Sequence, residues 1–262
     1  MLLEELKLNF ELLTEITTDL SMQFDGVDTD CRKKKTSTYY LAKLAHSCWS
    51  LNKLLPKSDD DFFDFPSIAA ICRNIIELTN LCWYYCIDDT DLLESEFRFL
   101  LYDFHDSTAL NSIFENLGFD MDDNDKLHEE KLDYKKLIIE HPRYQKLTAE
   151  EKKQVKKGRK STLQNQFQIV ESRRINSNEF HGIYKLLSTH THSTATSINF
   201  LTHSRLHSTD MNIAFLGLTI DYTSSFIADM VKSIGEIWHI EFAKSDSKEF
   251  IDHFVEQLYT DI

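Results

Sequence analysis

Three residues with reactive side chains recur at every fourth position in the second half of the chain. In the stretch "YKLLSTHTHS" these are Tyr184, Ser188 and His192. A helix would place their phenol, hydroxyl and imidazole groups along one face. Because an imidazole exchanges protons near neutral pH, the spacing indicates acid–base chemistry. A serine hydrolase is not indicated, since Ser188 has no Gly-x-Ser-x-Gly turn around it.

A second polar stripe lies on an otherwise apolar segment that begins at Pro66. Its members are spaced by four, three and four residues: Arg73, Glu77, Asn80 and Tyr84. A buried charge without a partner costs several kcal/mol, so we expect this stripe to face the first one. Two interpretations stay open. The stripes form a closed hydrogen-bonded seam that sets helix register, or they line a cleft where Arg73 binds an anion, His192 exchanges protons and Glu77 orients one of them.

Metal and cofactor sites are not indicated by the spacing of the remaining residues. Five of the eleven histidines fall between His181 and His207. His190 and His192 would point about 200 degrees apart on a helix, whereas His203 and His207, four residues apart, could share an ion. Carboxylates are nearly missing from this stretch, and nucleotide-binding glycine motifs are missing from the sequence. We therefore expect neither a metal nor a cofactor.

The charges of the chain are distributed unevenly. The net charge of −14 argues against a general nucleic-acid coat, yet residues 59–130 hold 19 acidic and 3 basic residues while residues 131–174 hold 5 and 13. The basic part contains "EEKKQVKKGRK". It predicts a surface for RNA or for a protein partner, made by Lys152, Lys153, Lys156, Lys157, Arg159 and Lys160. Alternatively, these side chains only face solvent or the acidic part.

Long helices should position all of these residues. Only six Gly and three Pro interrupt 262 residues, and apolar residues recur every three or four positions. We predict an all-α fold of one domain, with a main bundle at about 1–104 and 166–262 and a charged helical insertion at about 105–165. One helix is expected to break near residues 105–108. The five cysteines should be reduced core residues. No segment reads as a membrane span or a secretion leader, so we expect a cytoplasmic protein, and we predict a homodimer.

The combined motifs resemble an uncharacterised family of helical proteins from bacteria and their mobile elements, whose function is unknown. The resemblance covers roughly residues 66 to 200. It rests on Arg73-x-x-x-Glu77, on the Lys-rich segment that ends in Gly-Arg, and on Tyr184-x-x-x-Ser188-x-x-x-His192.

A second resemblance is to the helical HEPN superfamily, many of whose members are metal-independent ribonucleases of toxin and antiphage systems. Its mark is an Arg and a later His that are separated by four to six residues. Here these are Arg174 and His181, although Ile175 follows the Arg where a polar residue is usual. The resemblance implies that Arg174 stabilises the scissile phosphate and His181 transfers protons. We therefore expect an effector that cleaves RNA. The alternative is a non-enzymatic interaction or sensor module whose polar seam is structural.

Overall fold

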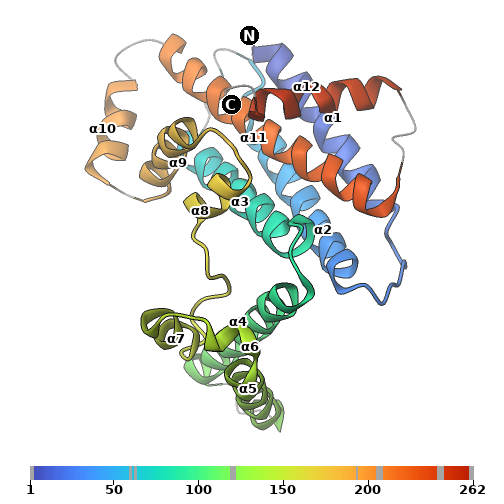
Figure 1. Cartoon of the computed structure of the whole chain (residues 1–262). Helices are drawn as coiled ribbons and strands as arrows, with labels where there is room; N and C mark the ends of the chain where they lie inside the picture. Colours follow the sequence, from blue (N-terminus) through green and yellow to red (C-terminus); the bar gives the residue numbers. More distant parts are fainter. Residues whose placement is uncertain are drawn as a thin grey trace. The chain divides into compact units, whose positions relative to one another are not determined.

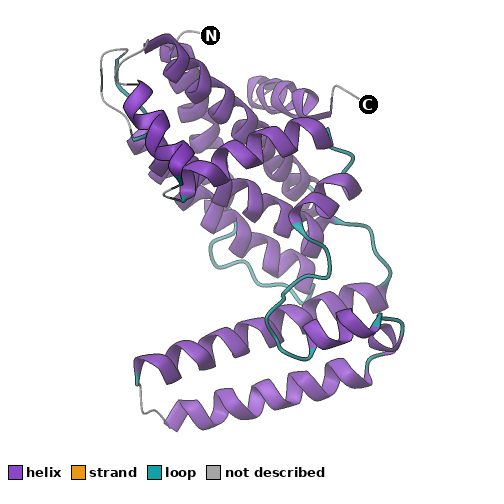
Figure 2. Ribbon diagram, turned by 90° about the vertical axis from the view of Figure 1, so that its left-hand side faces the viewer, coloured by secondary structure: helices purple, strands orange, loops and turns teal. Residues whose placement is uncertain are grey.

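The computed structural model confirms the all-α fold. It describes residues 3–58, 61, 64–118, 122–192, 194–204, 209–240 and 245–259, and every regular element in these ranges is a helix (Figures 1 and 2). The chain divides into two compact units. Unit 1 comprises Met1–Ile87 and Gln166–Ile262, and unit 2 comprises Asp88–Asn165. Among the described residues, no helix is both long enough and apolar enough to cross a membrane.

Unit 1 is a bundle built around its third helix. Its helices are α1 (Leu3–Met22), α2 (Arg32–Leu54), α3 (Phe65–Cys82), the π-helix η1 (Trp83–Ile87), α8 (Gln166–Ser172), α9 (Ser177–Thr191), α10 (Ala195–Ser204), α11 (Thr209–Trp238) and α12 (Ser245–Tyr259). In Figure 1, α3 lies among α2, α9 and α11, and it contacts each of them. Three of its side chains, Ile68, Cys72 and Ile75, are completely buried. The apolar character of this segment suits that central place.

Local sequence signals start the helices that carry the polar residues. Asp64 caps α3 by accepting a hydrogen bond from the Ser67 amide (3.3 Å), and Pro66 lies in the first turn. Asn176 caps α9 by accepting from the amides of Asn178 and Glu179. The cysteine prediction holds in part. All five thiols are free and four are buried, but Cys31 is exposed at the start of α2.

Unit 2 consists of a helical hairpin with two short helices packed on it. Its helices are α4 (Leu92–Leu117), α5 (Asp122–Glu140), α6 (Pro142–Gln145) and α7 (Ala149–Val155). Figure 2 shows α4 and α5 side by side along their length. One buried cluster joins all four helices: Phe97, Leu101, Phe104, Ile138, Tyr144, Leu147 and Val155. The expected break near residues 105–108 is wrong. The α4 helix continues through this stretch because Phe104 is held in this core. The Ser107 hydroxyl is satisfied within the helix, since it donates to the Phe104 carbonyl (3.2 Å).

Candidate functional site

Three of the polar residues predicted to meet do so between α3 and α9 of unit 1. The Nε atom of Arg73 donates to Glu77 (2.9 Å), and Nη2 of Arg73 donates to the Tyr184 hydroxyl (3.2 Å). That hydroxyl in turn donates to the same Glu77 oxygen (2.5 Å). The guanidinium also lies over the Tyr184 ring, 5.1 Å from its centre. We call these three residues the triad.

The triad lies at the surface of the bundle, so its charges are only partly withdrawn from water. The side chains of Arg73 and Glu77 are 23% and 29% exposed. Burial and the hydrogen bond to Glu77 raise the pKa of Tyr184, while Arg73 opposes this change. Burial lowers the pKa of Arg73, but Tyr184 and the Glu77 charge more than offset this, so the pKa is raised. The guanidinium therefore stays charged, and its Nη1 atom donates to no residue that the structure describes.

Two residues of the predicted stripe do not join the triad. The Ser188 hydroxyl donates to the Tyr184 carbonyl of its own helix (2.6 Å). The α9 helix ends at Thr191, and His192 takes an extended conformation (φ −113°, ψ 145°) with an exposed side chain. Among the described residues, no hydrogen bond or ion pair joins His192 to Arg73 or Glu77, so the predicted contact of His192 with the stripe on α3 is not formed.

An aromatic edge extends the triad along α8 and α9. The ring of Phe167 lies 5.5 Å from that of Tyr184 and 4.1 Å from that of His181, on which it stacks. His181 is exposed, and Phe167 is partly exposed. His181 and Tyr184 are three residues apart on one helix, whereas Phe167 comes from another helix and no local spacing in the sequence indicates it.

Arg174 and His181 do not form a pair. Arg174 is exposed in the turn after α8, with a left-handed backbone (φ 61°), and His181 contacts Phe167 instead. The buried arginine is its neighbour Arg173, which sequence reasoning missed. The lone carboxylate of Asp229 in the apolar run of α11 was a signal that a buried cation must come from elsewhere.

Arg173 is the centre of a buried polar network in unit 1. It donates through Nη1 to Asn80 and through Nη2 to Asp229 (2.7 Å), and its side chain is 1% exposed. Asp229 also accepts from the Tyr259 hydroxyl (3.0 Å), and Asn80 donates to Gln166 (2.8 Å). The expected single stripe on α3 therefore splits: Arg73 and Glu77 belong to the triad, whereas Asn80 belongs to this network.

His190 lies in the interior of unit 1. It is 5% exposed and meets the ring of Phe65 edge-on at 4.9 Å. Burial lowers the pKa of this imidazole. In the part of the chain that the structure describes, no three His, Cys, Asp or Glu side chains gather as metal ligands would. His207 and the side chain of His203 lie outside the described residues.

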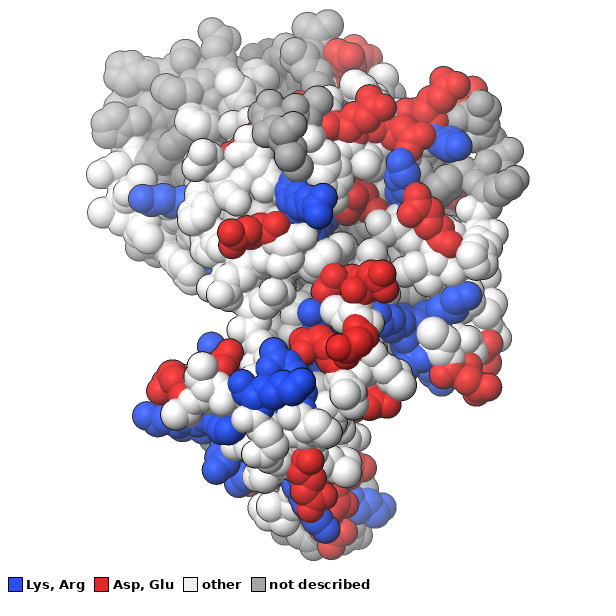
Figure 3. Space-filling model, viewed as in Figure 1, with Lys and Arg blue, Asp and Glu red and all other residues white. Residues whose placement is uncertain are grey.

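The predicted basic segment lies on α7 and the turn that follows it in unit 2. Five of its six cations are exposed: Lys153, Lys156, Lys157, Arg159 and Lys160. Lys152 is partly buried, because it donates to the Gln145 carbonyl (3.1 Å) and lies over the Tyr144 ring. Figure 3 shows blue side chains gathered where Figure 1 places α7.

Gly158 attaches the turn of this segment to α4. Its backbone is left-handed (φ 61°), and a Cβ atom there would come within 2.3 Å of the Thr108 hydroxyl. The carbonyl of Gly158 accepts a hydrogen bond from Nδ1 of His105 (3.0 Å). At the other end, Thr148 and Glu151 form a capping box. The basic segment is thus fixed to unit 2 at both ends.

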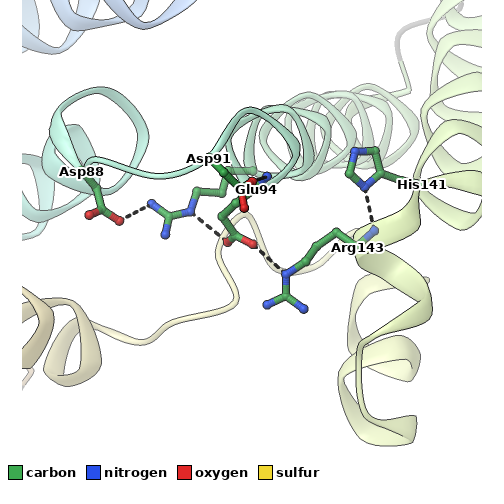
Figure 4. A network of polar contacts seen from close by, with 6 residues as sticks. Asp88, Asp91, Glu94, His141 and Arg143 are labelled. Carbon is green, nitrogen blue, oxygen red and sulfur yellow. Dashed lines mark hydrogen bonds and ion pairs between the residues drawn. The ribbon is translucent and has the colours of Figure 1, made fainter.

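A chain of ion pairs, which sequence reasoning missed, lies beside α6 in unit 2 (Figure 4). The buried Arg98 binds Asp88 (2.8 Å) and Glu94 (3.1 Å). The second oxygen of Glu94 accepts from Nε of Arg143 (2.6 Å). The i,i+4 spacing of Glu94 and Arg98 could have indicated one of these pairs, but Arg143 is too distant in sequence to be paired by spacing.

Comparisons with known proteins place the chain in a family. No curated protein and no solved structure matches it, and nothing found supports the resemblance to the HEPN superfamily. One family model, described as a family of unknown function (DUF5677), matches residues 38–210. The matched segment includes the triad and the whole of unit 2. The match spans more than half of the sequence, so the chain belongs to this family of unknown function.

Proposed function

We propose that this protein is an effector that cleaves RNA without a metal ion, at the surface formed by the triad and its aromatic edge. The observation that carries the proposal is the way in which Arg73 is bound and exposed. Glu77 and Tyr184 hold the guanidinium in place, it is partly exposed, and it has donors left for a phosphate oxygen. His181, exposed on the same face of α9 as Tyr184, supplies an imidazole that can take up and release a proton.

The proposed reaction is an internal transfer within RNA. His181 takes the proton from a ribose 2′-hydroxyl, and the 2′-oxygen forms a bond to the adjacent phosphorus. The bond from phosphorus to the 5′-oxygen breaks, that oxygen takes a proton from water, and His181 then returns its own proton to the hydroxide that is left. Arg73 stabilises the charge that builds on the phosphate. The Phe167 ring offers a stacking surface for a base. The products carry a 2′,3′-cyclic phosphate and a 5′-hydroxyl.

A second function is favoured by a different observation. The hydrogen bonds of the triad close on themselves, because Glu77 accepts from both Arg73 and Tyr184. A closed set of this kind fixes the register of two helices without any substrate. In that alternative the protein is a non-enzymatic interaction or sensor module. A toxin or antiphage role belongs to the first proposal, and the homodimer and the cytoplasmic location stay predictions.

The test compares substitutions in matched pairs. Purified wild type and the variants His181→Ala, His192→Ala, Arg73→Gln and Arg174→Gln are incubated with RNA in the presence of EDTA. We expect wild type, His192→Ala and Arg174→Gln to produce 5′-hydroxyl ends. The rate should fall by about a hundredfold or more in His181→Ala, since general acid–base catalysis contributes at least that factor. Circular dichroism checks that each variant is folded.

The controls separate the two functions. His192 and Arg174 are exposed and lie outside the triad, so equal losses in all four variants would contradict the proposed site. A folded wild type that leaves RNA intact would reject cleavage and favour the interaction module. Ends that carry a 5′-phosphate would reject the internal transfer.

A further inference from the structure

We infer that unit 2 carries a preformed binding surface for the phosphate backbone of single-stranded RNA, which includes Arg143. The surface comprises Arg143, Lys153, Lys156, Lys157, Arg159 and Lys160. The inference takes the identity of its ligand, RNA, from the proposed function. It concerns binding in unit 2 and not the cleavage proposed for unit 1.

The first observation is the way in which Arg143 is held. Only its Nε atom is used by Glu94, and the two terminal nitrogens donate to no residue that the structure describes. Figure 4 shows the Arg143 guanidinium beside Glu94, with its two terminal nitrogens directed away from that carboxylate. The side chain is 31% exposed. A guanidinium that keeps both terminal nitrogens can bind two oxygens of one phosphate.

The second observation is the rigid support beneath Arg143. Glu94, which orients it, is itself held by Arg98, and Arg98 is anchored on Asp88. The side chain of Arg98 is only 8% exposed. On the other side, the amide of Arg143 donates to Nδ1 of His141 (3.1 Å), which caps α6. Because the guanidinium is oriented before the ligand arrives, binding has a smaller cost in conformational entropy.

The third observation connects Arg143 with the basic segment. Glu151 lies close enough to both Arg143 and Lys160 for these cations to contribute to lowering the pKa of its carboxyl, although the hydrogen bonds from Thr148 are the larger causes. The Glu151 carboxylate is bound by its capping box, and the nearby Glu150 accepts from Gln154 (2.8 Å). The two local carboxylates therefore have partners of their own, and the lysines are left for a ligand.

The row of cations favours a nucleic-acid strand, which carries a negative charge at every nucleotide. The Arg143 fork can bind two oxygens of one phosphate, and the exposed cations of the segment suit the successive charges of the strand. Gly158 and the capping box fix the segment that carries these cations, so the surface exists before the ligand arrives.

The test measures how salt affects binding of a fluorescent single-stranded RNA oligonucleotide of mixed sequence. The full chain carries His181→Ala in every sample, so that RNA is not cleaved. Adding Arg143→Gln should weaken binding about tenfold and lower the slope of log affinity against log salt by about one. Arg143→Lys should weaken binding without changing the slope, because the charge remains while the fork is lost.

Two further variants protect the test from loss of folding. Lys160→Gln removes an exposed cation that is not part of the Glu94 pair, and it should lower the slope by about one as well. Lys43→Gln removes an equally exposed lysine from α2 of unit 1, and it should leave both affinity and slope unchanged.

The outcomes are distinct from those of the cleavage test. If Arg143→Gln and Lys160→Gln bind like the parent, or if Lys43→Gln weakens binding equally, the surface is refuted. Equal binding of a fluorescent poly-glutamate peptide would refute the assignment to phosphate. Strong, Arg143-dependent binding by the His181→Ala chain, together with a wild type that does not cleave RNA in the cleavage test, would support this surface and reject only the proposed activity.

Discussion

The ion pair between Arg173 and Asp229 should dominate the stability of unit 1. The two side chains are 1% and 10% exposed, and their contact of 2.7 Å joins α11 to the turn after α8. Asp229→Asn preserves the shape of the site but leaves the Arg173 charge without a counter-ion. Arg173→Met leaves the carboxylate without its cation. We expect each single change to lower the free energy of unfolding by about 3–5 kcal/mol.

The double variant, with both Asp229→Asn and Arg173→Met, separates the contribution of the ion pair from the cost of burying the charges. With both charges removed, the desolvation cost disappears together with the attraction, and what remains is the lost hydrogen bond from Arg173 to Asn80. That loss is worth about 1–3 kcal/mol. The double variant should therefore be more stable than either single variant, which corresponds to a coupling of about 3 kcal/mol or more.

Tryptophan fluorescence during urea unfolding provides a suitable assay. All three tryptophans, Trp49, Trp83 and Trp238, lie in unit 1, so the signal reports on this unit alone. A matched control is Asp28→Asn, because Asp28 pairs with Lys35 at the surface and is 88% exposed. Exposed pairs contribute little, so the control should unfold like wild type. Additive losses in the double variant would contradict the reasoning, as would single variants no less stable than the control.

Two further perturbations test the interior of unit 1 and the turn of unit 2. Burial lowers the pKa of His190 from its ordinary 6.5, so the unfolded chain takes up the proton first, and stability should be complete above pH 6.5 and decline as the pH falls below it. His190→Leu should remove this part of the decline in the free energy of unfolding, as measured by urea unfolding followed by tryptophan fluorescence. An unchanged pH dependence in this variant would exclude His190 as the source of the decline. Gly158→Ala combines a left-handed backbone with a clash against Thr108, whereas Gly118→Ala has the same backbone in open space. Gly118→Ala should cost about 1–2 kcal/mol and Gly158→Ala distinctly more, measured by hydrogen exchange of the α4 and α7 amides, and equal losses would show that the clash is relieved.

Much of the local structure followed from the sequence. The apolar periodicity predicted an all-α fold, and the helix ends of the structure fall at residue types typical of such ends: Asn176, Gly118 and the Thr148–Glu151 pair. These signals act between residues a few positions apart, so a single sequence displays them. The pairing of Arg73 and Glu77 with Tyr184 was also predicted, because two isolated polar groups on apolar helices have few other partners.

Only the tertiary structure decided where α9 ends and which arginine is buried. The spacing of Ser188 and His192 assumes a continuing helix, but the chain turns after Thr191 and carries His192 away. Arg173 and Arg174 are adjacent in the sequence and have the same side chain. The turn after α8 sends one toward Asp229 and the other into solvent. In the same way, Arg143 meets Glu94 across 49 residues of chain. Such pairings depend on how whole helices pack, and no local spacing encodes them.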